Sequence, residues 1–442
     1  MARLPGHRVD LADRTGDLLV VLALGLVVDE LRGLPDGLIH LFGVLLGVRA
    51  GRPGGAGQYG QLLHQRHGGP PSSVAVILTT RTNHPEVPRV TRAKTWARRG
   101  RPRKWPRGPP PRGPRLAIMR DLAALPKAHL HVHLESTIRP ATLRELGEAN
   151  GVDVPGEPPV FDGFRAFADY NALIRSCLRR PEDFERIARE YGEDEAAQGT
   201  RYAEVTFTAA SHGERLGDLE MPLKSVLKGL SQSENLEWRL LLDHSRRRSV
   251  ERAERTLDLA LRYAEVFAIG MAGEENHSLR PFAPLFGKAR AAGIHLLHHT
   301  GEDAGPDSIR EALEVGRTER LGHGIRVLDD PSLVAEVRAR GLALEVCPSS
   351  NVTLGLVPSL PEHPLPRLLE AGLTVTLNTD VPSVTGTGLA GEYARVQRAF
   401  GYDDTKMADF ARASVTASFA PEATKKAILR GIDAWLTPAA GG

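Results

Sequence analysis

Residues 125–140 read LPKAHLHVHLESTIRP, and three histidines alternate with apolar residues in this stretch. In a β-strand, the side chains of residues two apart point to the same face. His129, His131 and His133 are therefore predicted to share one face, with His131 and His133 about 7 Å apart along the strand. A strand of this kind predicts a buried site built around imidazoles.

Short apolar runs like this one alternate with helical stretches through the rest of the chain. Eight strand-like runs occur, at 129–134, 201–208, 237–245, 266–273, 294–302, 319–325, 342–350 and 373–380. Most are separated by an amphipathic segment such as ERAERTLDLALRYAE. Eight strand–helix units across about 300 residues predict an α/β fold, the parallel (β/α)8 TIM barrel. A doubly wound sheet is the alternative, although such a sheet does not need eight units.

The composition of residues 1–118 differs from that of the rest. This stretch holds 19 Lys and Arg against 7 Asp and Glu, whereas the remaining chain holds 38 basic and 47 acidic residues. Gly, Pro and Arg dominate residues 51–114, which leaves too little apolar surface for a core and predicts disorder. The apolar runs at 18–28 and 38–48 are shorter than the roughly 20 residues that a membrane-spanning helix needs.

Three interpretations of this basic extension compete. It is expected to lie outside the native protein, with translation starting at Met119 and residues 119–442 forming the barrel. The alternatives are a tether and a tail that binds nucleic acid through its arginines. Only two cysteines occur, Cys177 and Cys347, which excludes a disulfide framework and favours a reducing, cytoplasmic location.

Polar residues gather at the carboxyl ends of the predicted strands. These residues are His131, His133, His299, Glu302, His323 and Asp380. In a parallel barrel the carboxyl ends of all strands converge on one mouth, where active sites lie. Neutral imidazoles and a carboxylate suit zinc, and a catalytic zinc keeps one position open for water. His129 lies deeper and is expected to pack or hydrogen-bond rather than ligate; of the neighbours His298 and His299, only one can face the mouth.

Five motifs resemble those of the adenosine deaminase family of the amidohydrolase superfamily. They are LHVHLE (130–135), HTGE (299–302), RLGHGI (320–325), LEVCPSSN (344–351) and LNTD (377–380), and the similarity runs over residues 125–438. The resemblance implies one zinc ion per chain, held by His131, His133, His299 and Asp380. Binuclear relatives have a bridging lysine at the end of the fourth strand, where VFAIGMAGEE (266–275) offers none.

The resemblance also implies a reaction and a role for each site residue. Hydroxide generated at the zinc attacks C6 of an adenine ring, and ammonia leaves. Glu302 gives a proton to N1, so burial is expected to raise its pKa. His323 holds the attacking water and Asp380 takes its proton. Gly273 offers a backbone N–H to N3, and Glu135 lies near the sugar; the alternatives are a turn glycine and a capping or ion-paired carboxylate.

One departure from the family pattern leaves the substrate open. Val381 follows Asp380 where the family has a second aspartate, which binds N7 of the purine, and valine makes no such bond. Adenosine is the default substrate, and adenine, aminodeoxyfutalosine or a ring without N7 are the alternatives. The arginines of DHSRRR (243–248) are expected either to meet an anionic group of the substrate or to begin a helix in solvent.

Two other classes of protein compete with the enzyme. One is a barrel that binds a nucleoside without turning it over, and the other is a nucleic-acid binder acting through its basic tail. The intact acid, histidine and aspartate set favours the enzyme, because a binder needs no proton donor. The expected partner is a small purine compound, not nucleic acid or a membrane, and the sequence indicates no oligomeric state.

Overall fold

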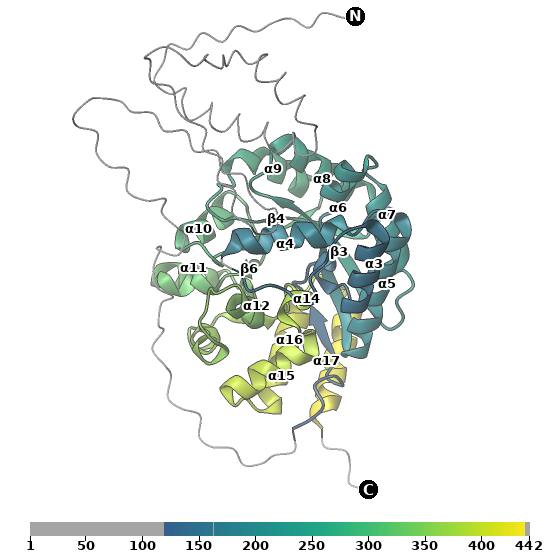
Figure 1. The fold of residues 1–442 in the computed structure, drawn as a ribbon. Helices are drawn as coiled ribbons and strands as arrows, with labels where there is room; N and C mark the ends of the chain where they lie inside the picture. Colours follow the sequence, from purple (N-terminus) through teal and green to yellow (C-terminus); the bar gives the residue numbers. More distant parts are fainter. Residues whose placement is uncertain (1–118, 162, 438–442) are drawn as a thin grey trace, which may run out of the picture. The chain divides into compact units, whose positions relative to one another are not determined.

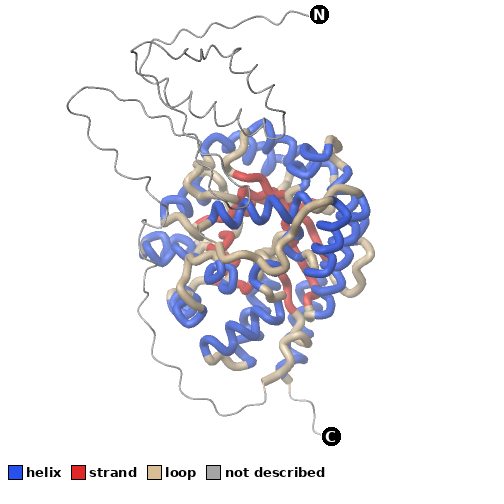
Figure 2. Tube along the Cα trace, in the orientation of Figure 1, coloured by secondary structure: helices blue, strands red, loops and turns tan. Residues whose placement is uncertain are grey.

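The computed structural model describes residues 119–161 and 163–437. The predictions for residues 1–118 lie outside this part of the chain. Eight parallel strands form one sheet in the order β1 to β8, which confirms the predicted TIM barrel, and Figure 2 shows them at the centre of the helices. In a doubly wound sheet, the order of the strands reverses part-way across the sheet. Here the strands lie side by side in their sequence order, which excludes that alternative.

The strands and helices alternate along the chain (Figure 1). The strands are β1 (Lys127–His129), β2 (Thr200–Phe207), β3 (Glu237–Ser245), β4 (Val266–Ala272), β5 (His295–Thr300), β6 (Leu321–His323), β7 (Ala343–Val346) and β8 (Thr374–Leu377). The helices are α3 (Pro140–Asn150), α4 (Phe164–Ser176), α5 (Pro181–Ala197), α6 (Ala209–Leu216), α7 (Met221–Leu230), α8 (Val250–Arg262), α9 (Ala283–Ala291), α10 (Pro306–Glu314), α11 (Pro331–Ala339), α12 (Pro348–Thr353), α13 (Leu365–Glu370), α14 (Pro382–Thr385), α15 (Leu389–Phe400), α16 (Asp404–Ala417) and α17 (Glu422–Leu436). Three helices, α3 to α5, separate β1 from β2. None of the helices in the described ranges is long and apolar enough to cross a membrane.

The first and last strands approach each other where the barrel closes. Val132 and Asp380 form a parallel bridge just beyond β1 and β8. The Asp380 N–H donates to the His131 carbonyl at 3.0 Å, and the His133 N–H donates to the Asp380 carbonyl at 2.9 Å. Helix α16 contacts both β1 and β8 and so covers this seam.

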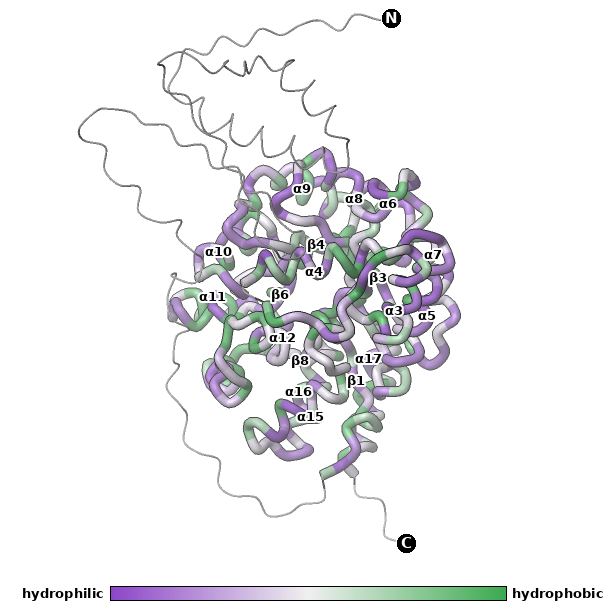
Figure 3. The backbone as a smooth tube through the Cα atoms, in the orientation of Figure 1, coloured by the Kyte–Doolittle hydropathy of each residue, from purple (hydrophilic) through white to green (hydrophobic). Residues whose placement is uncertain are grey.

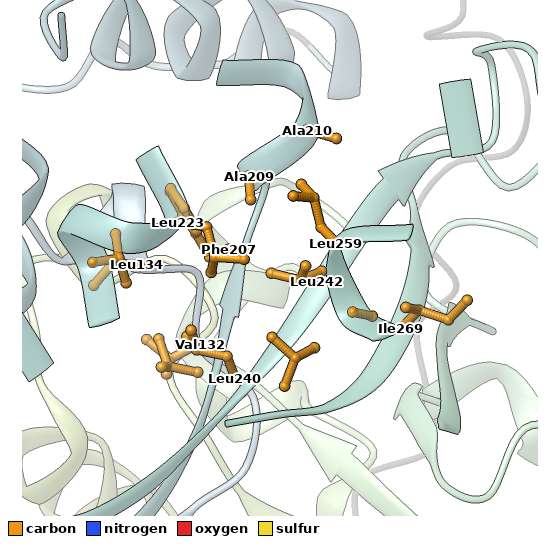
Figure 4. Close-up of a cluster of buried hydrophobic side chains, with 14 of the residues drawn as sticks. Val132, Leu134, Phe207, Ala209, Ala210, Leu223, Leu240, Leu242, Leu259 and Ile269 are labelled. Carbon is orange, nitrogen blue, oxygen red and sulfur yellow. The ribbon is translucent and has the colours of Figure 1, made fainter. Parts of the chain in front are cut away.

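Amphipathic helices bury one face against the strands, as α8 illustrates. Its buried residues are Ala253, Thr256, Leu257, Leu259 and Ala260. The steps of three or four positions from 253 to 256 and 257, and on to 260, place these residues on one face. Figure 4 shows Leu259 of the same helix in a cluster with Phe207 of β2, Leu242 of β3 and Leu223 of α7. The outer helix α5 is coloured as largely hydrophilic in Figure 3, as expected for a helix with a solvent-facing side.

Several strands are shorter than the sequence predicts. β1 ends at His129, so His131 and His133 lie beyond the regular strand, in a segment paired through isolated bridges. Residues 348–350 were predicted to end the seventh strand but begin α12. Pro348 explains this difference, because proline lacks the N–H that a strand ladder uses and fits the first position of a helix.

Candidate metal centre and active-site cavity

The four predicted metal ligands come together at the carboxyl ends of the strands. His131 and His133 follow β1, His299 lies in β5, and Asp380 follows β8. One donor atom from each of the four residues lies within 4.8 Å of the donors of the other three. Residues distant in sequence therefore form a single cluster.

The donor set fits a divalent metal ion. The Nε2 atoms of His133 and His299 are 3.1 Å apart, and Asp380 Oδ1 is 3.4 Å from His133 Nε2 and 3.6 Å from His131 Nε2. Donors held about 2.0–2.2 Å from a tetrahedral zinc lie about 3.3–3.6 Å from one another. Within the described ranges, the buried His131 Nε2 has no hydrogen-bond partner. Burial, followed by the charges of the His131 and His133 rings, holds the pKa of His299 well below its usual range. Although burial opposes the shift, the Asp380 and Glu345 carboxylates raise the pKa of His131 to about 10, so metal binding at this site must displace a proton from His131.

A chain of buried charges orients His131. Its Nδ1 lies 2.8 Å from Glu345 Oε2, while Arg320 donates from Nε to Glu345 Oε1 at 2.6 Å and from a terminal nitrogen to Glu204. Although burial opposes the shift, the Arg320 guanidinium and the His131 ring lower the pKa of Glu345 to about 2. An ionised Glu345 fixes the ring so that Nε2 faces the other donors.

Two residues at this end of the barrel have left-handed backbones although neither is glycine. His323 has φ 62° and Asp380 has φ 59°. Such a conformation costs of order 1–3 kcal/mol per residue and is retained where the surrounding structure imposes it, often at functional sites. For Asp380, the bridge to Val132 fixes the backbone and the Ser350 hydroxyl donates to Oδ2 at 2.6 Å.

Glu302 and His323 face each other beside the donor cluster. Glu302 Oε1 lies 3.6 Å from His323 Nε2, and both atoms are buried without a hydrogen-bond partner among the described residues. Burial, followed by the charges of Asp380 and Glu275, raises the pKa of Glu302 well above its usual range. Burial, followed by the charge of His131, lowers the pKa of His323 to about 3. The pair therefore consists of a carboxylic acid and a neutral imidazole.

Hydrogen bonds behind His323 define its tautomer. His363 Nδ1 accepts from the Leu365 N–H at 3.1 Å, so His363 Nε2 carries the proton and donates to Asn351 Oδ1 at 3.1 Å. The amide of Asn351 then presents Nδ2 to His323 Nδ1 at 3.3 Å. Because His323 Nδ1 accepts, its Nε2 carries a proton and points at the site.

Glu275 fixes the loop that carries Glu302. Its carboxylate accepts from the backbone N–H groups of Gly301 at 2.7 Å, Glu302 at 2.7 Å and Asp303 at 3.1 Å, and also from the Ser308 hydroxyl. Three backbone donors converging on one buried carboxylate make the loop rigid.

The sequence interpretation missed Glu275, Arg320, Glu345, Ser350 and Asn351. All five lay in stretches already singled out. Arg320 lay in RLGHGI, Glu275 lay in VFAIGMAGEE, and the other three lay in LEVCPSSN. A polar residue inside an otherwise apolar run was the available signal. Their partners, however, come from distant strands, so no spacing in the sequence indicated what they bind.

The cavity over this centre has a volume of about 800 Å³. The predicted substrate contacts Glu135 and Gly273 both line it, together with Glu302 and Asp380. Glu135 Oε1 is 3.0 Å from His212 Nε2 and accepts from the Thr208 N–H at 3.2 Å, so this oxygen already has partners.

Both the backbone conformation at position 273 and the space around it favour glycine. Gly273 has φ 88°, and a Cβ there would lie 3.1 Å from Ser245 Oγ. A side chain would be both strained and crowded at this point of the cavity wall. The geometry is compatible with the predicted backbone contact and with the turn glycine considered as its alternative.

Two histidines whose orientation the sequence left to be settled, His129 and His298, lie outside the donor cluster. His129 pairs with Glu195 at 3.0 Å and, through Nε2, lies 3.0 Å from Thr379 Oγ1. His298 accepts from the Met271 N–H at 3.1 Å and bonds the Gly316 carbonyl at 3.0 Å. Of the two adjacent histidines in β5, it is therefore His299 that faces the mouth.

Val381 does not face the cavity in the way that the family's second aspartate was expected to. Its side chain is 1% exposed and belongs to an apolar cluster that includes Val132 and Leu134. An aspartate placed here without other changes would bury a carboxylate among apolar groups. Position 381 therefore contributes packing in this chain.

This fold and donor set define a TIM-barrel protein with a candidate metal centre at the carboxyl ends of its strands. The sequence model of the family described as adenosine deaminase matches residues 126–435, and the chain belongs to that family.

Three known proteins illustrate the similarity. A putative adenosine/adenine deaminase of Streptomyces virginiae is 36% identical over 334 residues, which is 72% of this chain and 98% of that protein. The crystal structure of an adenine deaminase from Arthrobacter aurescens is 31% identical with a TM-score of 0.67, and the match covers 71% of this chain and 99% of that one. A cog1816 amidohydrolase from Burkhoderia ambifaria, solved with bound Zn, is 25% identical with a TM-score of 0.63, covering 71% and 92% of the two chains.

Proposed function

We propose that this protein is a zinc-dependent aminohydrolase that removes the exocyclic amino group of an adenine-bearing compound. The observation that carries the proposal is the juxtaposition of the four-donor cluster with a protonated carboxylic acid, since Glu302 Oε1 lies 3.6 Å from His323 Nε2 beside Asp380. Membership of the adenosine deaminase family and the names of its relatives support the same reaction.

We assign the zinc to His131, His133, His299 and Asp380, because three imidazoles and one carboxylate match the ligands that zinc prefers. Zinc held there would supply a hydroxide nucleophile near neutral pH. The solved relative with bound Zn supports this choice of metal.

The chain's own residues position the reactants and move protons. Glu302, kept protonated by burial, gives its proton to N1 of the ring as electron density builds up there during attack at C6. The Nε2–H of His323 donates to the attacking water and holds it in place. Asp380 accepts one proton of that water and passes it to the amino group, which leaves as ammonia.

Two residues of the cavity wall are assigned to the substrate. The backbone N–H of Gly273 binds N3 of the ring, and Glu135 lies beside the sugar or its equivalent. Adenosine, adenine and aminodeoxyfutalosine remain the candidate substrates. We further propose that residues 119–442 are the functional unit and that it works in the cytoplasm, where its two buried free cysteines stay reduced.

The test is a deamination assay on zinc-loaded protein with adenine, adenosine, deoxyadenosine and aminodeoxyfutalosine, read as ammonia release. We expect about one zinc per chain and turnover of at least one compound. The matched variant Glu302→Gln should retain zinc and lower kcat by about 10²- to 10⁴-fold, because it lacks the acidic proton. Zinc binding without ammonia release from any of the compounds would contradict the proposal and leave a non-catalytic binder.

A further inference from the structure

The cavity that contains the proposed metal ligands has a second region rich in arginine. Arg175 of α4, Arg247 and Arg248 of the β3–α8 loop, and Arg252 of α8 all line the same cavity as His299 and Asp380. We call these four residues the arginine group. Arg175 is more than 70 residues from the other three, which are neighbours in sequence, so the fold brings its charge to theirs.

The positive charge of the arginine group is only partly neutralised. Arg252 pairs with Glu214, but that carboxylate also binds Arg255 at 2.8 Å. Within the described ranges, the side chains of Arg247 and Arg248 have no ion-pair or hydrogen-bond partner, and Arg175 donates only to the Asn171 carbonyl at 3.3 Å.

The arginines also act on one another. Burial, followed by the charges of Arg252 and Arg247, lowers the pKa of Arg248, and Glu214 is the carboxylate that opposes this shift. The proposed metal-site carboxylates Asp380 and Glu302 are not among the groups that act on Arg248 most strongly. Like charges held together at a cavity wall are stabilised when an anion binds between them.

Helix α8 adds to the positive potential. It begins at Val250, with Ser249 as its N-cap after the exposed pair Arg247 and Arg248, and its first two turns supply Arg252 and Arg255 to the cavity wall. The N-terminal end of a helix carries a partial positive charge. The cavity, about 800 Å³, is near the upper end of the range of small-molecule sites, so it has room for more than a purine ring.

We propose that the substrate carries, besides its adenine ring, an anionic group that Arg247 and Arg248 bind together with Arg175. This inference rests on the proposed function and specifies its substrate class. The planar, forked guanidinium suits a phosphate monoester and a carboxylate equally, so the shared chemistry is an oxyanion with two or more acceptor atoms. Free adenine and adenosine lack such a group.

The test compares kcat/KM of the zinc-loaded full chain for adenosine, adenosine 5′-monophosphate and adenosine-5′-carboxylate. We expect one anionic compound to exceed adenosine by at least about 10-fold, and the compound that does so distinguishes phosphate from carboxylate. In the double variant Arg247→Gln/Arg248→Gln, the ratio of kcat/KM for that compound over adenosine should fall by about 10- to 100-fold. The matched control is Arg165→Gln, because Arg165 lines the same cavity but is paired with Asp169 at 2.6 Å.

Two outcomes would overturn the inference. One is adenosine turned over as efficiently as both anionic compounds, and the other is a double variant that loses the same factor on all three. Absence of turnover for every adenine compound would instead contradict the proposed function. The arginine group is then tested by calorimetric titration with adenosine 5′-monophosphate: binding weakened in the double variant supports the anion site, and absence of binding by the unmodified protein overturns it.

Discussion

The two regions of the cavity are built in opposite ways. Around the proposed metal ligands, the side chains are held by buried neighbours, as Glu345 holds His131 and Ser350 holds Asp380. In the arginine group, Arg247 and Arg248 are exposed and have no partner among the described residues. The comparison indicates that the proposed reacting groups are fixed before a substrate arrives, whereas the charges of the arginine group are available for the proposed anionic ligand to neutralise.

Removing a ligand should break the fixed region most completely. Asp380→Ala removes the one carboxylate among the four donors. We expect zinc content to fall to background and kcat/KM to fall by more than about 10³-fold, because the proposed source of the nucleophile is lost with the metal. Metal analysis and the deamination assay measure this, with Asp169→Asn as a control on the cavity wall. A variant that keeps its zinc would contradict the assignment of Asp380 as a ligand.

The support behind His131 should be the next most sensitive element. Arg320→Met leaves Glu204 and Glu345 buried without their cation, and Arg320 is itself only 3% exposed. We expect a loss of about 3–5 kcal/mol in the free energy of unfolding and about 10- to 100-fold weaker zinc binding.

Denaturant unfolding of the zinc-free protein and chelator competition separate these two effects. Arg340→Met is the matched control, because Arg340 forms an exposed pair with Glu336 at 3.2 Å. That control should change stability by less than about 1 kcal/mol. If Arg320→Met bound zinc as tightly as the unmodified protein, Arg320 would be structural only.

The smallest effect is expected where only the position of Glu302 changes. Glu275→Gln weakens the carboxylate that accepts three backbone N–H groups of the loop. Each hydrogen bond to a charged group contributes about 1.5–3 kcal/mol of stabilisation, and losing part of it should allow Glu302 to move from its position. We therefore expect kcat to fall by about 10-fold while the zinc content is unchanged. The neighbouring variant Glu274→Gln is the control. Equal kcat values for the two variants would show that the hydrogen bonds from the loop to Glu275 have no part in catalysis.

Short-range patterns in the sequence predicted the fold and the strand ends at which polar residues gather, whereas the four members of the donor cluster were implied by the resemblance to the adenosine deaminase family. Strand-like runs ending in His299 or Asp380 are recognisable one at a time, and the barrel's geometry brings the ends of parallel strands together. Strand lengths were predicted less well, since the chain leaves the regular strand after His129. Apolar and polar residues still alternate in the sequence beyond His129, so the pattern does not show where the regular strand ends. In the structure, residues 132 and 133 pair only through isolated bridges, to Asp380 after β8 and to Thr206 of β2.

The supporting residues were not predictable because each depends on a partner from another strand. One chain of buried charges joins Arg320, which immediately precedes β6, to Glu204 in β2 and Glu345 in β7. More than a hundred residues separate Glu204 from Arg320 in the sequence. The tautomer of His323 likewise follows from Asn351 and His363 together. The effect of Val381 was also outside the reach of the sequence, because its burial among apolar side chains is a tertiary property.

The proposed ligands lie across the seam at which the barrel closes, with His131 and His133 on one side and Asp380 on the other. During synthesis, a nascent chain that has emerged as far as β7 possesses the three imidazoles and lacks the aspartate. The complete set of proposed ligands is therefore available only once the chain has been synthesised beyond β8. A metal ion bound at that stage would link the segment after β1 to the segment after β8 and so hold the barrel closed.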